Sequence, residues 1–409
     1  MGATRTALIV TLSVVAGCSA VAPPPPQSRG ADATARPDEP TSEASTQVPR
    51  ESFDASAAPP GWTQVAEFGG AGELDVAAAV HAGGIYLIAG DVTVGEPGDA
   101  TFRTEARLWR SVDAASWTGV ALPAPTGLEV VALVPAPDEG FLLSGLRYSE
   151  DGDRRVVFLR STDGLDWAAA ETDLPGSLFV DELVQGPEGY VLLTERSDDL
   201  GASLWFSTDG VSWERTHDLT ESSNWVQVAD LAAGSQGFMA FGMHVPEAEG
   251  PWIRASVVSQ DGRGWTDVDQ PFGEEDLRVR IARLELAVSE FDGEWVAGVA
   301  SPDATAEIFR SGDGQTWEAV ATVDGETVPM GSDIRLLQAG EELYLGIRPE
   351  GAQLGAMRDR IWLSPDAEAW KAVSFGPITT LGGVAAGAHG AILAGVTGAS
   401  GEVTVWLRR

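Results

Sequence analysis

The sequence predicts an all-β fold, a seven-bladed β-propeller, because one short motif recurs six times at nearly constant spacing. The copies read RSVDAASW, RSTDGLDW, FSTDGVSW, VSQDGRGW, RSGDGQTW and LSPDAEAW. They end at Trp117, Trp167, Trp213, Trp265, Trp317 and Trp370, with steps of 50, 46, 52, 52 and 53 residues. A period near fifty residues with about four strands in each unit is typical of propeller blades.

Each unit contains four predicted strands, as the first unit illustrates. Alternating or continuous apolar runs occupy 62–68, 74–80, 85–90 and 105–111, and turn residues separate them. Runs of this length between turn residues indicate strands of a β-sheet. The last of the four runs ends at the motif serine, and the motif itself therefore forms a hairpin between two strands.

The two ends of the repeat array predict how the ring closes. Trp62 begins a strand of the kind that follows a motif, but no motif stands before it. The run 403–409 has the pattern of the strand that precedes a motif, but no motif follows it. We therefore expect the N-terminal strand to complete the last blade, which leaves only short protected edges. Six blades with irregular ends is the alternative.

The composition excludes several partners. The 409 residues carry a formal net charge of −35, which disfavours nucleic acid and anionic membrane surfaces. The chain has one cysteine, so no internal disulfide is possible, and its four histidines show no metal-ligand spacing. We expect no metal and no cofactor, and a monomer.

The first sixty residues have the composition of an export signal and a tether. An apolar run of ten residues, 7–16, is too short to span a bilayer. Its last two residues and the two that follow read Val-Ala-Gly-Cys, which resembles the lipobox of bacterial lipoproteins. The resemblance implies that Cys18 is lipidated. Residues 1–17 are then the signal peptide, and the Pro/Ala/Ser-rich stretch 18–60 is a disordered tether that spans on the order of 35 Å. We expect the propeller, 61–409, to be held at the extracytoplasmic face of the cell membrane by that lipid alone.

The repeated motif resembles the Asp-box, or BNR repeat, of sialidase-type propellers. This chain has S-x-D-G-x-x-W, one residue shorter than the usual form, and two copies replace the glycine with Ala114 and Ala367. The motif aspartate of each copy is expected to accept hydrogen bonds from its own turn, and the tryptophan to pack as an apolar wedge. Six copies cannot surround one substrate, so the motif predicts structure rather than catalysis.

Long loops and a charged axis are the candidate binding regions. The short turns and the motifs fall on one face of the ring, and long irregular connections fall on the other, where we expect a protein or glycan ligand. Aligning the innermost strands places seven residues at one position near the axis: Ala78, Ala132, Glu182, Asp230, Glu285, Arg335 and Gly383. The four charged residues are candidate ligand-binding groups, because like charges that converge in a tunnel shift pKa values and bind cations or polyols. Solvated groups that line a water-filled channel are the alternative.

The sequence favours a binding protein over an enzyme. The sialidase resemblance implies three arginines, a Tyr–Glu pair and an acidic residue, but no arginine triad is apparent. Tyr148 is a weak catalytic candidate because it lies in a loop beside Glu150. Glu182, Asp230 and Glu285 are weak candidates for a different glycosidase, since two carboxyl groups at a suitable separation suffice. A sialidase-like glycoside hydrolase acting on glycans, and an assembly factor for a membrane complex, are the alternative functions.

Overall fold

The computed structural model describes residues 59–69, 73–95, 103–137, 140–148, 154–175, 178–196, 202–219, 225–244, 253–269, 286–300, 305–324, 333–348, 360–376, 378–397 and 401–409. The predicted signal peptide, 1–17, lies outside the described residues, as do Cys18 and all but the last two residues of the predicted tether, 18–60. Glu150 and Glu285 lie outside them as well. No described helix is long and apolar enough to cross a membrane.

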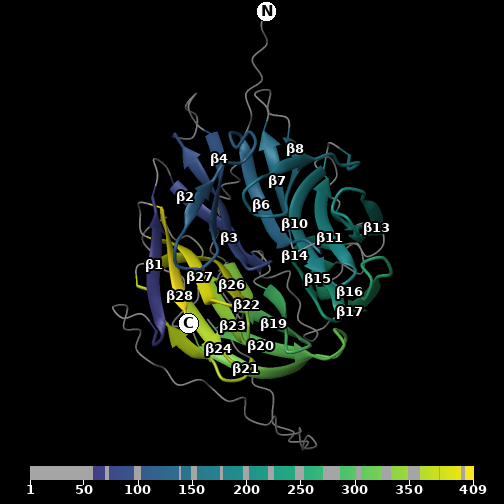
Figure 1. Cartoon of the computed structure of the whole chain (residues 1–409). Helices are drawn as coiled ribbons and strands as arrows, with labels where there is room; N and C mark the ends of the chain where they lie inside the picture. Colours follow the sequence, from purple (N-terminus) through teal and green to yellow (C-terminus); the bar gives the residue numbers. More distant parts are fainter. Residues whose placement is uncertain are drawn as a thin grey trace, which may run out of the picture. The chain divides into compact units, whose positions relative to one another are not determined.

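The described residues form seven four-stranded antiparallel sheets (Figure 1). Blade 1 comprises β2 (Glu73–Ala82), β3 (Ile85–Val94), β4 (Arg103–Ser111) and β5 (Thr118–Val120). Blade 2 comprises β6 (Leu128–Pro135), β7 (Phe141–Tyr148), β8 (Arg154–Ser161) and β9 (Ala168–Ala170). Blade 3 comprises β10 (Leu178–Gly186), β11 (Gly189–Arg196), β12 (Ala202–Ser207) and β13 (Glu214–Asp218). Blade 4 comprises β14 (Trp225–Gly234), β15 (Gly237–His244), β16 (Ile253–Ser259) and β17 (Thr266–Asp269).

The remaining three blades complete the ring. Blade 5 comprises β18 (Leu286–Phe291), β19 (Glu294–Ala300), β20 (Thr305–Ser311) and β21 (Glu318–Asp324). Blade 6 comprises β22 (Asp333–Ala339), β23 (Glu342–Arg348), β24 (Arg360–Ser364) and β25 (Lys371–Val373). Blade 7 comprises β26 (Ile378–Gly387), β27 (Gly390–Thr397), β28 (Glu402–Arg408) and β1 (Trp62–Phe68).

The predicted closure is confirmed, because the first strand pairs with the last. Trp62 lies opposite Arg408 and Phe68 lies opposite Val403 in an antiparallel ladder between β1 and β28. The inner strands β2, β6, β10, β14, β18, β22 and β26 contact one another in order around the axis, and β26 contacts β2. The ring therefore has seven blades, and the six-bladed alternative is wrong.

Each repeated motif forms a hairpin in which the motif aspartate accepts the serine hydroxyl and two backbone N–H groups. In the second copy Asp163 Oδ1 accepts the backbone N–H groups of Leu165 and Asp166, at 2.8 and 3.0 Å. Ser161 donates its hydroxyl to that same oxygen at 3.1 Å and accepts the N–H of Gly164 at 2.9 Å. Because these bonds are local, the motif aspartate has the turn-forming role that the sequence predicts.

The motif tryptophans pack against the preceding blade. Trp213 of blade 3 stacks on Phe158 of blade 2, with ring centroids 5.4 Å apart. Trp370 of blade 6 lies in one buried cluster with Ile308 and Ala321 of blade 5. Burying an aromatic ring of this size at each junction stabilises the contact between neighbouring sheets.

Candidate functional site in the axial cavity

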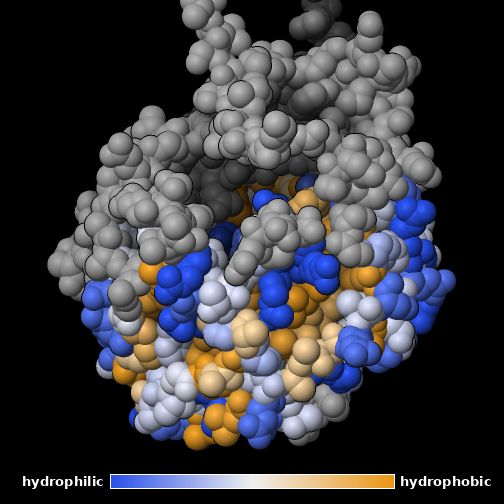
Figure 2. Space-filling model, turned by 90° about the horizontal axis from the view of Figure 1, so that it is seen from above, coloured by the Kyte–Doolittle hydropathy of each residue, from blue (hydrophilic) through white to orange (hydrophobic). Residues whose placement is uncertain are grey.

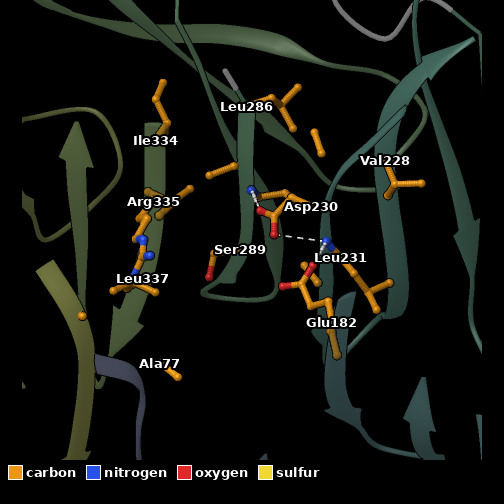
Figure 3. Close-up of a pocket in the computed structure, with 17 residues that line it drawn as sticks. Ala77, Glu182, Val228, Asp230, Leu231, Leu286, Ser289, Ile334, Arg335 and Leu337 are labelled. Atoms are coloured by element: carbon orange, nitrogen blue, oxygen red, sulfur yellow. Dashed lines mark hydrogen bonds between the residues drawn. The ribbon is translucent and has the colours of Figure 1, made fainter. Parts of the chain in front are cut away.

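A cavity of about 550 Å³ lies where the inner strands converge (Figure 3). Its walls come from six blades, with Ala77 of β2 and Gly382 of β26 at one side and Ile334 of β22 at another. Glu182, Asp230, Ser289 and Arg335 supply polar side chains, and alanine, valine and leucine side chains supply most of the remainder. A cavity of this size with a few convergent polar groups is suited to a small ligand.

The register of the strands confirms part of the axial alignment and changes one member. Six of the seven aligned residues lie opposite the same position of the second strand in their blades. They are Ala78, Ala132, Glu182, Asp230, Arg335 and Gly383. In blade 5 the residue at this position is Ala287, which lies opposite Gly298, and Glu285 falls two residues earlier in the chain. The structure thus brings Glu182, Asp230 and Arg335 to one cavity and puts an alanine where the alignment expected a third carboxyl group.

The carboxyl groups of Glu182 and Asp230 form hydrogen bonds to the next blade, at the junctions between blades 3 and 4 and between blades 4 and 5. Glu182 of blade 3 accepts the backbone N–H of Leu231 in blade 4 at 2.8 Å. Asp230 of blade 4 accepts the N–H of Leu231 at 3.1 Å and that of Val288 in blade 5 at 2.6 Å. An inner strand has no sheet partner on its axial side, so its N–H groups on that side need other acceptors. The side chains of Glu182 and Asp230 supply them.

Arg335 makes the complementary contact at another junction. Its Nη1 donates a hydrogen bond to the carbonyl oxygen of Leu381, from blade 6 to blade 7, at 3.1 Å. In Figure 3 its guanidinium group lies across the cavity from Asp230 and Glu182, with Ser289 between them. The cavity therefore has a carboxyl pair on one side and a cation on the other.

The carboxyl group of Glu182 favours its protonated form. Burial is the main cause that raises the pKa of Glu182 well above its ordinary value, and the neighbouring Asp230 raises it further. Both oxygens of Asp230 accept backbone N–H groups. Arg335 lies opposite these two residues (Figure 3), so the cavity presents a guanidinium group as well as carboxyl groups.

A second polar cluster lies between blades 1 and 2. The hydroxyl group of Tyr148 donates to Glu129 Oε2 at 2.5 Å, and the Arg154 guanidinium lies 4.9 Å from the centre of the Tyr148 ring. Asp91 accepts the N–H of Val130 at 2.9 and 3.0 Å, one distance for each carboxyl oxygen. Burial raises the pKa of Asp91 to about 8, although this N–H bond opposes the shift.

Sequence reasoning found one member of this second cluster, Tyr148, and missed Asp91 and Glu129. The partner of Tyr148 in the structure is Glu129, which lies 19 positions earlier in the chain, whereas the sequence pointed to Glu150. Asp91 did leave a signal, because it is a charged residue inside the otherwise apolar strand IYLIAGDVTV. Burial together with a nearby carboxylate raises the pKa of Tyr148 to about 12.

The described surface mixes hydrophobic and hydrophilic residues (Figure 2). On the face seen in Figure 2, hydrophobic residues lie in small groups among hydrophilic ones. The long connections expected to carry a ligand fall largely outside the described residues. Within the ranges that the structure describes, no group of three or more His, Cys, Asp or Glu side chains could hold a metal ion.

Comparison with known proteins identifies the fold. No family model and no curated protein matches the chain. Among solved structures, the BP39L lectin from Burkholderia pseudomallei is 15% identical, with 82% of this chain and 96% of that chain covered and a TM-score of 0.56. The Hadza microbial sialidase Hz136 is 15% identical over 74% of this chain and 66% of its own, with a TM-score of 0.46. Trypanosoma rangeli sialidase is 12% identical over 86% and 59%, with a TM-score of 0.44. The likeness to the BP39L lectin is one of fold alone.

Proposed function

We propose that this chain is a non-catalytic propeller that binds a neutral carbohydrate in its axial cavity, outside the cytoplasm. The observation that carries the proposal is the polar lining of the cavity, in which the Arg335 guanidinium faces the carboxyl groups of Glu182 and Asp230. A site that presents both a cation and carboxyl groups favours a neutral ligand with many hydroxyl groups over an ion of either sign. Carboxyl and guanidinium groups bind hydroxyl groups well, and the small apolar side chains between them suit the C–H faces of a sugar.

The roles of the carboxyl groups support binding rather than hydrolysis. A glycosidase carboxyl group must exchange a proton with the substrate or attack it. Glu182 and Asp230 already use oxygens to accept backbone N–H groups of the next blade. Moving either group toward a substrate would break a contact between blades.

The location proposed for the protein rests on the sequence. Lipidation at Cys18 and the tether 18–60 would hold the propeller at the outer face of the membrane, where glycans are abundant. The likeness to a lectin in fold is compatible with a glycan ligand. A protein partner at the long loops is the alternative to a glycan.

Substitution of Ser289 tests the axial site, because this residue lines the cavity without holding a neighbouring blade. Ser289→Leu removes the hydroxyl group and fills part of the cavity, so we expect it to weaken glycan binding at least about tenfold, or about 1.4 kcal/mol. Binding is measured by screening the full chain in mild detergent on a glycan array and then by calorimetry with the best neutral ligand. Thr208→Leu, an exposed position in a motif hairpin, is the matched control and should bind like the wild type. Unchanged affinity in Ser289→Leu, or no glycan bound at all, would disprove the axial site.

The second candidate function is a sialidase-like glycoside hydrolase, and one observation favours it. The hydrogen bond from Tyr148 to Glu129, beside a protonated Asp91, brings together a phenol, a carboxylate and an acid. If this cluster is catalytic, the wild-type chain hydrolyses aryl glycosides, and Tyr148→Phe loses at least about 100-fold in rate. Tyr190→Phe, which changes a buried tyrosine in the second strand of blade 3, is the control. Wild-type protein without turnover on a panel of such substrates would rule out this candidate.

A further inference from the structure

The residue just before the motif serine on the third strand has a counterpart in every blade, and in several blades it lies against the motif hairpin of the next blade. Pairing of the second and third strands places these residues at equivalent positions. From blade 1 to blade 7 they are Arg110, Arg160, Phe206, Val258, Arg310, Leu363 and Leu407. Their side chains therefore determine how the gap between two neighbouring hairpins is filled.

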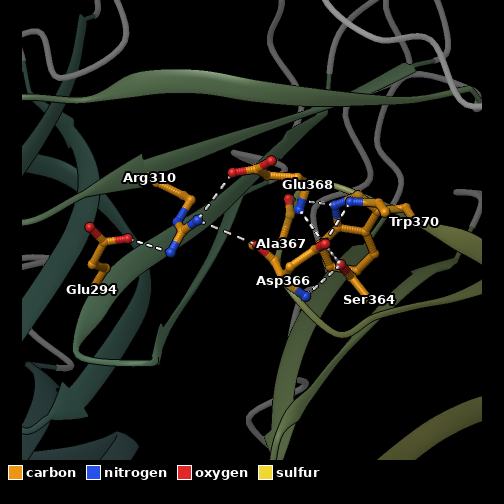
Figure 4. Close-up of polar contacts among 8 residues, drawn as sticks. Glu294, Arg310, Ser364, Asp366, Ala367, Glu368 and Trp370 are labelled. Atoms are coloured by element: carbon orange, nitrogen blue, oxygen red, sulfur yellow. Dashed lines mark hydrogen bonds and ion pairs between the residues drawn. The ribbon is translucent and has the colours of Figure 1, made fainter.

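Arginine fills this gap at two junctions with the same contact. Arg110 of blade 1 donates from Nε to the carbonyl oxygen of the motif aspartate Asp163 in blade 2, at 2.8 Å. Arg310 of blade 5 donates from Nη1 to the corresponding carbonyl oxygen of Asp366 in blade 6, at 3.4 Å (Figure 4). The Arg310 guanidinium also pairs with Glu368 of that hairpin, at 3.5 Å, and with Glu294 of its own blade. The hairpin of the next blade is thus an acceptor for a guanidinium group.

The junction between blades 4 and 5 lacks this arginine and is hollow. Val258 stands at the arginine position, and its short side chain lines a groove of about 530 Å³. Asp313 and Gln315 of the next hairpin line the opposite side, where Asp366 and Glu368 stand in blade 6. The acceptors of the hairpin are present, and the groove is open where an arginine at position 258 would reach.

The groove has the charge and the lining that a guanidinium group needs. Asp261 and Asp313 are its two ionisable residues, and backbone N–H groups that bond them hold the pKa of each carboxyl below its ordinary value. Both are therefore ionised at neutral pH, and none of the described lining residues is basic. Val258, which is partly exposed, supplies apolar surface for the methylene stem of an arginine, and the buried Phe238 and Trp295 also line the groove.

We propose that the groove between blades 4 and 5 binds an arginine side chain of a partner protein, in the place that Arg110 and Arg310 take at other junctions. Arginine suits the site better than lysine because its planar group donates to a carbonyl oxygen and a carboxylate at the same time. The net charge of −35 also attracts a basic partner over distance. This site lies on the face of the motif hairpins and is separate from the axial cavity.

Peptide titration of the full chain in mild detergent tests the proposal. The probes are acetyl-Gly-Arg-Gly-amide and the same peptide with citrulline, which keeps the shape of arginine but has no charge. We expect saturable binding of the arginine peptide, observed by NMR, and binding of the citrulline peptide that is at least about fivefold weaker. Equal affinity for the two peptides, or no binding of the arginine peptide, would overturn the proposal.

Two variants supply the missing cation from within the chain. Val258→Arg should place a guanidinium group in the groove between blades 4 and 5, as Arg310 does between blades 5 and 6. We expect this variant to lose peptide binding. Gln315→Arg, at an exposed residue, should have the same effect and serves if Val258→Arg does not fold. The matched control is Val112→Arg, which adds the same charge at a residue 52% exposed in the motif of blade 1 and should leave binding unchanged. Full binding by folded Val258→Arg and Gln315→Arg would contradict the site, as would its loss in Val112→Arg.

Discussion

Single carboxyl groups bond to inner strands of this ring across blade junctions. Asp91, Glu182 and Asp230 each accept an N–H group of the following blade. The sequence predicted charge at the axis, but it gave no sign of these partners, because a backbone N–H group is present at nearly every residue. Which N–H lacks a sheet partner depends on strand order, and that is a property of the fold.

The protonation of Asp91 predicts how stability changes with pH. Its pKa is about 8 in the folded chain against an ordinary value of 3.8, so the folded state holds one more proton than the unfolded state between these values. The free energy of unfolding therefore falls as pH rises through this window. Asp91→Asn removes the titration. We therefore expect the free energy of unfolding of the variant, minus that of wild type, to be at least about 1 kcal/mol larger at pH 9 than at pH 5. Urea unfolding at both pH values measures the difference, and an equal difference at pH 5 and pH 9 would contradict the assignment.

At the scale of one element, the motif hairpin requires a left-handed backbone at its fourth position. The residue there has a φ of 60° in Ala114, 61° in Ala367 and 72° in Gly314. The sequence predicted this turn because glycine at four of the six copies signals positive φ. The two alanines adopt the same conformation, so the hydrogen bonds to the motif aspartate and serine hold the turn even when the residue disfavours it.

Substitution of glycine in one hairpin tests that requirement. A Cβ atom on Gly314 would lie 2.6 Å from Met239 Cε and 2.9 Å from Val258 Cγ1, and its φ is positive. We expect Gly314→Ala to lower the free energy of unfolding by about 1–3 kcal/mol. Gly312→Ala in the same hairpin is the control, because nothing lies within 4 Å of its Cβ position, and it should change stability by less than about 0.5 kcal/mol. Similar values for both variants in denaturant unfolding would argue against strain at Gly314.

Inner strands show where prediction from sequence stops at this scale. β2, β6, β10, β14 and β26 each contain a register shift, whereas β18 and β22 have none. An extra residue in a bulge changes the count along a strand without a clear mark in the sequence. The error at Glu285 has a separate cause: an alignment on the last aliphatic residue of each inner strand fails in blade 5, where Ser289 holds the position that an aliphatic residue holds in the other blades.

For the whole molecule, the long repeat made the architecture predictable. Seven sheets and their closure follow from spacing that recurs over the full array, so errors in single strands do not accumulate. Within the part of the chain that the structure describes, the polar cluster of Asp91, Glu129 and Tyr148 does not recur from blade to blade. Sequence reasoning that depends on repetition therefore found the scaffold and overlooked most of that cluster.

Removal of the closing strand tests the ring as a unit. Trp62 packs edge-to-face on Tyr344 of blade 6 and on Phe375, with ring centroids 6.2 and 5.1 Å apart. A chain that lacks residues 1–68 loses β1 and exposes the edge of β28, so we expect its melting temperature to fall by at least about 10 °C and aggregation to increase. A chain that lacks only residues 1–58 keeps β1 and should melt like the full chain. Calorimetry and light scattering compare the two, and equal melting temperatures would show that closure contributes little.

Pairing of β1 with β28 also imposes an order in time. The first strand of the ring leaves the ribosome long before its only sheet neighbour has been synthesised. Blade 7 can assemble only after β28 has been synthesised, and the growing chain must keep that early segment soluble until then. Closure of the ring therefore waits for a strand made after all the other blades.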